Sequence, residues 1–346
     1  MADDLFPHVI GQKKVKWEWT RMIQENRVPH TMILYGDEGV GKTTAAIDLA
    51  CRLADSRGDQ ALYDICRTWT AADRDSQEKL LQAKERIWYI RPVGMELKME
   101  QFRLFLRAAD SFTEDVHVCM IDEAQTMMPP VANALLKTLE EPAENLYFIL
   151  ITHDLSSILP TIQSRAVKFS FLPLNEQEYR QLISLHASLF GVRGEDDIET
   201  AFQLTGGNPG MTRDIFAGGS GGQPEKAAQF WDTVTHSETP FTALSGTVLT
   251  DRKEFLKNLK WIRLAGRDIL LSRAVPRENF RRCRSVEKTE IALADSWTEE
   301  QMDQALQVLG TAEKACRRYI SVKSIWDMIL IELLYIRKGH ATWKRS

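Results

Sequence analysis

Short apolar runs recur through the first half of the chain, with stretches of helical periodicity between them. The runs have the continuous apolar character of strands buried on both faces, and they cover residues 31–35, 87–90, 116–121, 146–151 and 167–171. Between the runs, apolar residues recur three and four positions apart, which predicts amphipathic helices over residues 44–53, 98–109 and 131–140. An N-terminal helix carries Val15, Trp19, Met22 and Ile23 on one face. The first half is therefore expected to combine strands and helices.

After residue 172 the pattern is almost entirely helical. Helical periodicity covers residues 174–190 and 198–204, and later residues 225–236, 253–271, 299–319 and 322–337. The sequence A-G-G-S-G-G-Q-P at residues 217–224 is the clearest linker, because glycine and serine bury too little surface to order themselves. We therefore predict a domain boundary near Gly222. A polar stretch also lies at residues 54–86, where residues 73–84 predict an exposed helix of mixed charge.

Composition limits the class of protein. Of the 346 residues, 44% are apolar and 27% are charged, as in a soluble globular protein of about two or three domains. No apolar run is long enough to cross a bilayer, and the acidic residues 1–6 are unlike a signal peptide. The expectation is a cytoplasmic protein with no membrane partner. A net charge of −4 argues against a surface that coats nucleic acid everywhere, but it permits local basic stripes.

The motif G-D-E-G-V-G-K-T at residues 36–43 has the phosphate-loop spacing G-x-x-x-x-G-K-[ST]. An apolar run precedes it and a helical pattern follows it, so successive backbone N–H groups and the helix N-terminus should converge on one anion. Lys42 would bring a positive charge to the outer phosphates, and Thr43 would place its hydroxyl on Mg²⁺. The alternative is a glycine-rich turn followed by an ordinary lysine. The residues expected to contact the nucleotide in this segment are Gly36, Gly39, Gly41, Lys42, Thr43 and Thr44.

An acidic pair, Asp122 and Glu123, follows the strand predicted at residues 116–121. In a chain with an upstream phosphate loop, such a pair is the expected second half of a nucleotide site. Asp122 would share the Mg²⁺ with Thr43, and Glu123 would orient and deprotonate the attacking water. The alternative is a turn of two acids at a strand end. Polar residues that begin with Thr152 end the next predicted strand and would read the γ-phosphate.

Several strings together resemble one family. They are V-I-G-Q at residues 9–12, the phosphate loop, I-D-E-A at 121–124, N-A-L-L-K-T-L-E-E-P at 133–142 and L-P-T-I-Q-S-R at 159–165. In these strings the chain is similar to bacterial DNA polymerase III clamp-loader AAA+ subunits, most of all to the delta-prime type. The resemblance spans most of the first 170 residues, and the string at 133–142 is far more specific than any phosphate loop.

The resemblance implies a fold and a function. The fold would be an α/β AAA+ P-loop domain over residues 1–172, a helical lid over 173–217, a Gly/Ser linker over 218–224 and an all-α collar over 225–346. The function would be ATP-dependent loading of the sliding clamp onto primed DNA by a hetero-pentamer that contains tau/gamma-type and delta-type subunits. Arg165 would be an arginine finger that acts in trans on a neighbour's ATP. Thr152 would stand near the first sensor.

The chain departs from the family pattern in several places. Relatives usually carry four zinc-binding cysteines after the phosphate-loop helix, whereas only Cys51 and Cys66 lie in that zone, so no zinc is expected. The other cysteines, Cys119, Cys283 and Cys316, are scattered and are expected to be reduced. In the second-sensor region Met211 stands where many relatives have arginine, which leaves Arg213 as the candidate. Open alternatives are a tau/gamma-type motor subunit, a ring member that does not hydrolyse ATP, and a branch-migration helicase.

Two groups of arginines are candidates for contact with DNA. Arg103 and Arg107 lie four residues apart on the helix predicted at residues 98–109. In relatives that helix faces the channel of the ring, where phosphate contacts hold the duplex without reading bases. A second basic cluster, Arg277, Arg281, Arg282 and Arg284, is better explained as a solvated loop. Solvation of a helix face remains the alternative for Arg103 and Arg107.

Overall fold

The computed structural model describes residues 5–54, 86–92, 94, 96–109, 115–192, 194–216, 223–245, 251–274, 287–316 and 321–339. The chain divides into two compact units. The first comprises Met1–Phe190 and Gly206–Thr212, and the second comprises Gly191–Thr205 and Arg213–Ser346. The domain boundaries proposed from the sequence stay predictions. The helix expected at residues 73–84, most of the linker, the arginine cluster at 277–284 and the residues from 340 onward lie outside the described residues.

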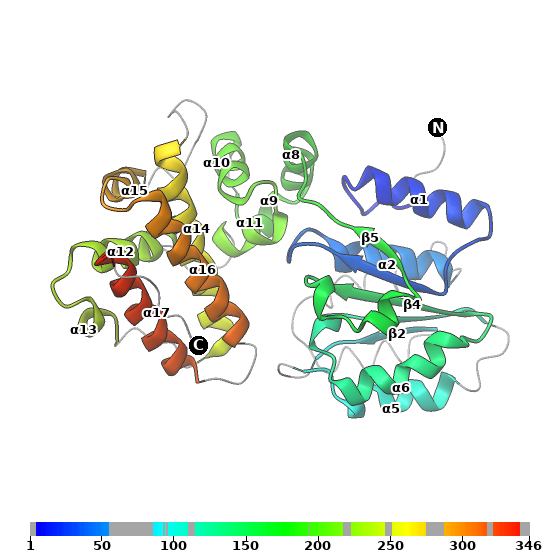
Figure 1. The fold of residues 1–346 in the computed structure, drawn as a ribbon. Coiled ribbons are helices and arrows are strands. Elements are labelled where there is room, and N and C mark those ends of the chain that lie inside the picture. Colours follow the sequence, from blue (N-terminus) through cyan, green and yellow to red (C-terminus); the bar gives the residue numbers. More distant parts are fainter. Residues whose placement is uncertain are drawn as a thin grey trace. The chain divides into compact units, whose positions relative to one another are not determined.

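A five-stranded parallel sheet forms the centre of the first unit (Figure 1). Its strands are β1 (Thr31–Tyr35), β2 (Ile87–Ile90), β3 (His117–Ile121), β4 (Leu146–Thr152) and β5 (Val167–Ser170). They stand in the order β2-β3-β4-β1-β5, and each lies where the apolar runs predict it, to within one residue at either end. Because all strands are parallel, the segments that follow β1, β3 and β4 meet at one edge of the sheet.

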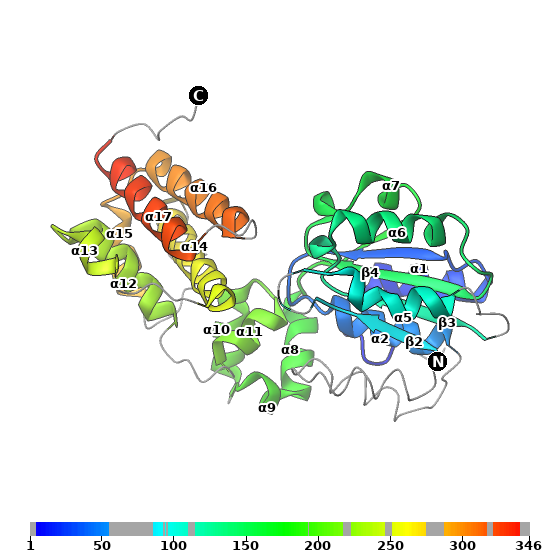
Figure 2. The ribbon, with the colours of Figure 1, turned by 90° about the horizontal axis from the view of Figure 1, so that it is seen from below.

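Helices cover both faces of this sheet (Figures 1 and 2). On one face α1 (Lys13–Gln24) and α2 (Lys42–Leu53) pack against Met32 and Leu34 of β1. On the other, α5 (Met99–Ala109), α6 (Pro129–Glu140) and α7 (Pro160–Gln163) pack against Ile33. Neighbouring residues of β1 thus enter different cores, which explains why its sequence is apolar without alternation. Helix α6 begins at Pro129, whose missing N–H is not needed at that position.

The helical pattern at residues 174–190 is interrupted in the structure. Helix α8 (Glu176–Leu185) begins with a capping box in which Asn175 and Glu178 bind each other's backbone N–H groups. It ends before His186, and the short α9 (Ala187–Phe190) follows. The expectation of one continuous helix was therefore wrong. No glycine or proline lies at the break, so the sequence carries no local signal for it.

The described part of the second unit is helical. Its helices are α10 (Glu195–Thr205), the second half of α11 (Pro209–Phe216), α12 (Gln223–His236), α13 (Pro240–Ser245), α14 (Arg252–Ala274), α15 (Glu287–Ala294), α16 (Glu299–Cys316) and α17 (Val322–Arg337). One apolar core contains residues from each of the helices α12 to α17, and three buried indoles donate hydrogen bonds across it. Trp231 donates to Ile262 O, Trp297 to Thr235 Oγ1 and Trp326 to Leu244 O. A parallel α/β sheet followed by a helical region confirms the predicted fold class.

Candidate nucleotide-binding site

The phosphate loop joins β1 to α2 through three glycines with positive φ angles. These angles are 143° at Gly36, 88° at Gly39 and 93° at Gly41, and Gly41 is the N-cap of α2. A Cβ atom at Gly36 would lie 2.1 Å from the carbonyl oxygen of Phe171, which follows β5. Both the backbone angle and the close approach therefore require glycine at this position. The loop ends on a helix N-terminus, where backbone N–H groups have no helical partner and attract anions.

Lys42, the first residue of α2, is folded back over the loop. Its Nζ donates to Gly36 O at 2.7 Å and to Asp37 O at 2.6 Å, and only 7% of the residue is exposed. A buried ammonium is unfavourable unless acceptors surround it. These two carbonyls hold the charge across the loop, so that it is in place for an incoming phosphate.

Residues 206–212 form a second segment that contacts the phosphate loop, and this contact has no signal in the sequence. Asn208 Nδ2 donates to Glu38 O at 2.8 Å, and Gly210 N donates to Gly39 O at 3.0 Å. A Cβ atom at Gly210 would lie 2.4 Å from Gly39 Cα, so neither glycine tolerates a side chain. Two carbonyl oxygens that would repel phosphate are thereby bound to this second segment.

The candidate magnesium ligands lie together, Asp122 just after β3 and Thr43 at the start of α2. Thr43 Oγ1 donates to Asp122 Oδ2 at 3.3 Å, and the N–H of Glu123 donates to Asp122 Oδ1 at 2.9 Å. The hydroxyl of Tyr89, on β2, also donates to Asp122 Oδ2, at 2.5 Å. Burial, and then the charge of Asp122, raise the pKa of Tyr89 well above its usual value. A hydroxyl and a carboxylate beside a phosphate loop fit Mg²⁺, which prefers oxygen ligands.

Glu123, the candidate base, follows Asp122 in a left-handed backbone conformation. Its φ is 49°, and it precedes the short 3₁₀ helix η1 (Ala124–Thr126). Its side chain is exposed. A positive φ at a residue other than glycine is uncommon and stores local strain, which is a feature of functional sites. The turn directs Glu123 away from the sheet core, while Asp122 stays partly buried.

Thr152, at the end of β4, lies between the two halves of the site. Strand β4 separates β1 from β3, and Thr152 pairs in register with Tyr35, the residue before the phosphate loop. Only 1% of Thr152 is exposed, and its hydroxyl lies 2.9 Å from Gln125 Oε1 and 3.0 Å from both Asp154 O and Asp154 N. Gln125 was missed by sequence reasoning, and its Nε2 is buried without a partner in the described structure.

Arg165 lies just before β5, beside the end of α6. Its guanidinium forms an ion pair with Glu140 at 2.6 Å and donates to Thr161 O at 2.8 Å. The side chain remains 37% exposed. The contact joins two of the strings that carry the family resemblance, because Glu140 belongs to the string at 133–142. Arg165 is therefore held in position while remaining accessible at the surface.

The remaining candidate residues differ in their exposure. Arg103 and Arg107 are exposed on α5 together with Leu104, on the side opposite the buried Phe102 and Phe105. On α11, Arg213 is also exposed. Met211, on the same helix, is partly buried.

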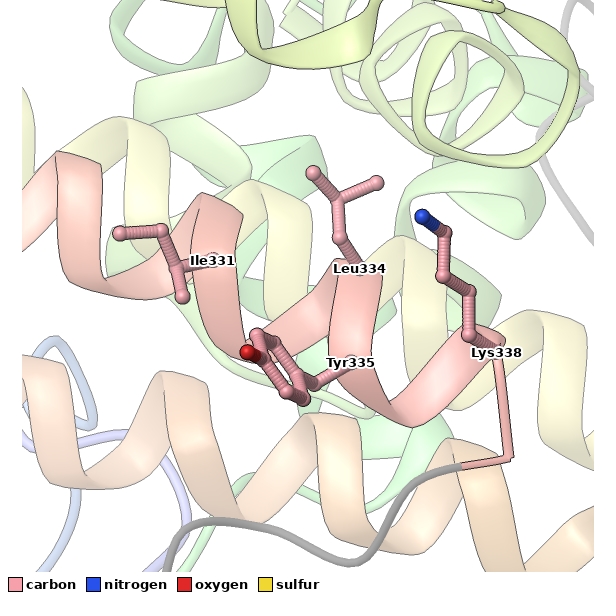
Figure 3. Close-up of a pocket in the computed structure, with 4 residues that line it drawn as sticks. All are labelled: Ile331, Leu334, Tyr335 and Lys338. Atoms are coloured by element: carbon pink, nitrogen blue, oxygen red, sulfur yellow. The ribbon is translucent and has the colours of Figure 1, made fainter.

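Further features of the described residues do not add a site. No group of three or more His, Cys, Asp or Glu side chains there is arranged to hold a metal ion. Cys51 is partly buried and Cys119 and Cys316 are buried, whereas Cys66 and Cys283 lie outside the described residues. None of the described helices is long and apolar enough to span a membrane. A hollow of about 300 Å³ on α17 is lined by Ile331, Leu334, Tyr335 and Lys338 (Figure 3), and its lining has no arrangement that defines a ligand.

Comparisons with known proteins agree with the resemblance seen in the sequence. Residues 11–175, slightly less than half of the chain, match the family described as "DNA polymerase III, delta subunit". Replication factor C small subunit 2 of Pyrobaculum islandicum is 29% identical over 204 residues, which are 59% of this chain and 57% of that protein. DNA polymerase III subunit gamma of Buchnera aphidicola is 31% identical over 175 residues, 50% of this chain and 46% of that protein.

The chain thus spans about half the length of the curated relatives it matches. A crystal structure of a DNA polymerase III gamma subunit-related protein from Thermotoga maritima aligns with 92% of this chain and 99% of its own, at 13% identity and a TM-score of 0.46. That likeness is too weak to support an argument. The family match covers the sheet and its phosphate loop. Residues 11–175 are therefore similar to the DNA polymerase III delta-subunit family, and the chain also resembles replication factor C small subunits and a DNA polymerase III gamma subunit.

Proposed function

We propose that this chain is an ATP-binding subunit of a bacterial DNA polymerase III clamp loader, most like the delta-prime subunit. The observation that carries the proposal is the meeting of Lys42, Thr43 and Asp122 at one edge of the sheet, within a segment that matches the DNA polymerase III delta-subunit family. In a ring with tau/gamma-type and delta-type subunits, the chain would take part in placing the sliding clamp on primed DNA.

Each site residue has a role in this proposal. The backbone of residues 36–43 cradles the phosphates, and Lys42 holds a positive charge against them. Thr43 and Asp122 hold Mg²⁺, which neutralises negative charge on the phosphate oxygens. Glu123 orients and deprotonates the attacking water. Thr44, Thr152 and Arg213 are proposed as further contacts to ATP, and no zinc is needed for any of these steps.

Arg165 is proposed to act on the ATP of a neighbouring subunit. A planar guanidinium stabilises the charge that develops on a transferring phosphoryl group, and it can do so in trans. The ion pair with Glu140 supports this role, because it holds an exposed arginine in one orientation at the surface of the first unit. A positioned, accessible guanidinium is what a finger requires.

Arg165→Ala should leave ATP binding by this chain unchanged and should lower turnover at the neighbour's site by about 1000-fold. ATPase activity of the assembled ring and ATP affinity of the isolated chain are the two measurements. Arg165→Lys is the matched control, since it keeps the charge but loses the planar fork and should restore little activity. A collapse of this chain's own ATP affinity in Arg165→Ala would make Arg165 a cis residue and the assignment wrong.

Arg103 and Arg107 are proposed to contact the DNA backbone. Both are exposed on one side of α5, as a phosphate contact requires. The double change to alanine should weaken binding of the assembled loader to primed DNA by about tenfold and reduce the salt slope of log K by about two. Titration of labelled primed DNA at several salt concentrations measures both effects. Arg180→Ala, at a surface arginine paired with Glu176, serves as the control. An unchanged salt slope would leave both arginines as solvated surface residues.

A second candidate is a tau/gamma-type motor subunit, which the match to a gamma subunit favours. Native mass spectrometry of the complex isolated from the protein's own cells separates the possibilities. One copy beside tau/gamma-type and delta-type partners supports the delta-prime proposal. Several copies in each ring identify the motor subunit. A ring built from this chain alone overturns both and returns the branch-migration helicase as the alternative.

A further inference from the structure

Tyr89 contacts the candidate magnesium ligand although it belongs to neither motif of the nucleotide site. Its hydroxyl donates to Oδ2 of Asp122, the same oxygen that accepts from Thr43. Tyr89 lies 46 residues beyond Thr43 in the chain and 33 before Asp122, on a strand that sequence analysis marks only as an apolar run. The hydrogen bond between Tyr89 and Asp122 is explained by the position of β2 in the sheet, without the phosphate loop or Glu123.

The sheet determines where the Tyr89 hydroxyl lies. Strand β2 pairs in parallel with β3, so that Tyr89 is opposite Met120, and Asp122 N donates to Ile90 O at 2.8 Å. Tyr89 packs with the core on the α2 face, whereas Trp88 packs with the core on the other face. The phenol therefore extends along the face that carries Thr43 at the start of α2. Its position is set by the backbone pairing and by core packing.

We propose that Tyr89 is a positioning residue of the magnesium-ATP site, which holds the Asp122 carboxylate in the orientation that faces Thr43. The inference rests on the proposed binding of ATP at this site. Two hydrogen bonds define the plane of the carboxylate, from Glu123 N to Oδ1 and from Tyr89 Oη to Oδ2. Without Tyr89, Oδ2 of Asp122 would keep, among the described residues, only the 3.3 Å contact with Thr43, and the carboxylate could rotate.

A fixed carboxylate matters more for Mg²⁺ than for the nucleotide itself. Mg²⁺ requires near-ideal octahedral geometry and is reluctant to give up its water ligands, so a carboxylate without a fixed orientation binds it poorly. Groups that orient a metal ligand through a hydrogen bond typically contribute about 10- to 100-fold in metal affinity or activity. The phosphate loop and Lys42 contact the phosphates directly and do not depend on Asp122. Removal of the Tyr89 hydroxyl should therefore affect the metal complex selectively.

The test is Tyr89→Phe in the whole chain, with calorimetric ATP binding measured in Mg²⁺ and again in EDTA. We expect the affinity for ATP in Mg²⁺ to fall by about tenfold and the affinity in EDTA to stay the same. Tyr147→Phe is the matched control, because it removes a hydroxyl from β4 of the same sheet, where the ring stacks on His30. Tyr89→Phe should add little to Asp122→Asn, since the hydroxyl acts through that carboxylate.

The other outcomes separate this inference from the proposed function. An equal loss in Mg²⁺ and in EDTA would mean that Tyr89 acts through core packing, which overturns the positioning role. An unchanged affinity in Mg²⁺ overturns it as well and leaves the nucleotide site standing. If the wild-type chain fails to bind ATP under either condition, the proposed function fails and the inference with it. An additive effect of Tyr89→Phe on Asp122→Asn would show that the hydroxyl does not act through Asp122.

Discussion

Replacing Lys42 with alanine should reduce the affinity of this chain for ATP in Mg²⁺ by at least about 100-fold. The ammonium is the charge that the loop holds in place, through Gly36 O and Asp37 O. Hydrogen bonds that involve a charged group contribute about 1.5–3 kcal/mol each, so loss of two phosphate contacts alone corresponds to about 100-fold or more. The two carbonyls also lose their shared donor, which should loosen the loop.

Binding of a fluorescent ATP analogue to the purified variant measures this effect. Lys168→Ala is the matched control, because Lys168 is an exposed cation on β5 and its removal should leave binding unchanged. A Lys42→Ala chain that binds ATP as wild type does would exclude the phosphate-loop assignment. In the assembled loader, the Lys42→Ala variant tests whether clamp loading requires ATP at this subunit. If clamp loading survives unchanged, the chain is a ring member that needs no ATP of its own.

The residues that the sequence identified are those with a local signal. The phosphate loop could be predicted because its glycines, lysine and threonine follow each other within eight positions and lie between a strand and a helix. Asp122 could be predicted because it directly follows an apolar run. Parallel strand order then brings these separate signals to one edge of the sheet, and the 3.3 Å contact between Thr43 and Asp122 is the result.

The residues that sequence reasoning missed act across long chain separations. Tyr89 and Asn208 look like an ordinary strand aromatic and a loop amide until the fold places them on Asp122 and Glu38. Gln125, in the short 3₁₀ helix η1, becomes a candidate only through its contact with Thr152 on β4. Glu140 was part of a recognised string, yet its contact with Arg165 depends on how α6 and α7 pack. Periodicity and spacing report on one element at a time, so they cannot reveal contacts of this kind.

In the second unit, the largest stability effect is expected at Trp231. The side chain is fully buried, and its ring lies edge-on to Trp297 with centroids 5.3 Å apart. Its Nε1 donates to Ile262 O on α14 at 2.7 Å. On the same helix, a Cβ atom at Gly266 would lie 2.6 Å from the Trp231 ring, so the indole occupies space that only glycine leaves open. Trp231 thus links α12, α14 and the segment before α16.

Trp231→Ala should destabilise this helical unit by about 4 kcal/mol, the centre of the range for deleting a buried aromatic side chain. Amides of α14 and α16 that exchange only through opening of the unit should then exchange about 1000-fold faster. Hydrogen exchange with mass spectrometry measures this, and amides of β1 and β4 in the same chain are the internal control. Trp231→Phe keeps a ring against Trp297 but loses the bond to Ile262 O, and it should cause a smaller effect. Equal acceleration by both variants would assign the stability to the hydrogen bond, whereas no acceleration by Trp231→Ala would show that the unit does not depend on this indole.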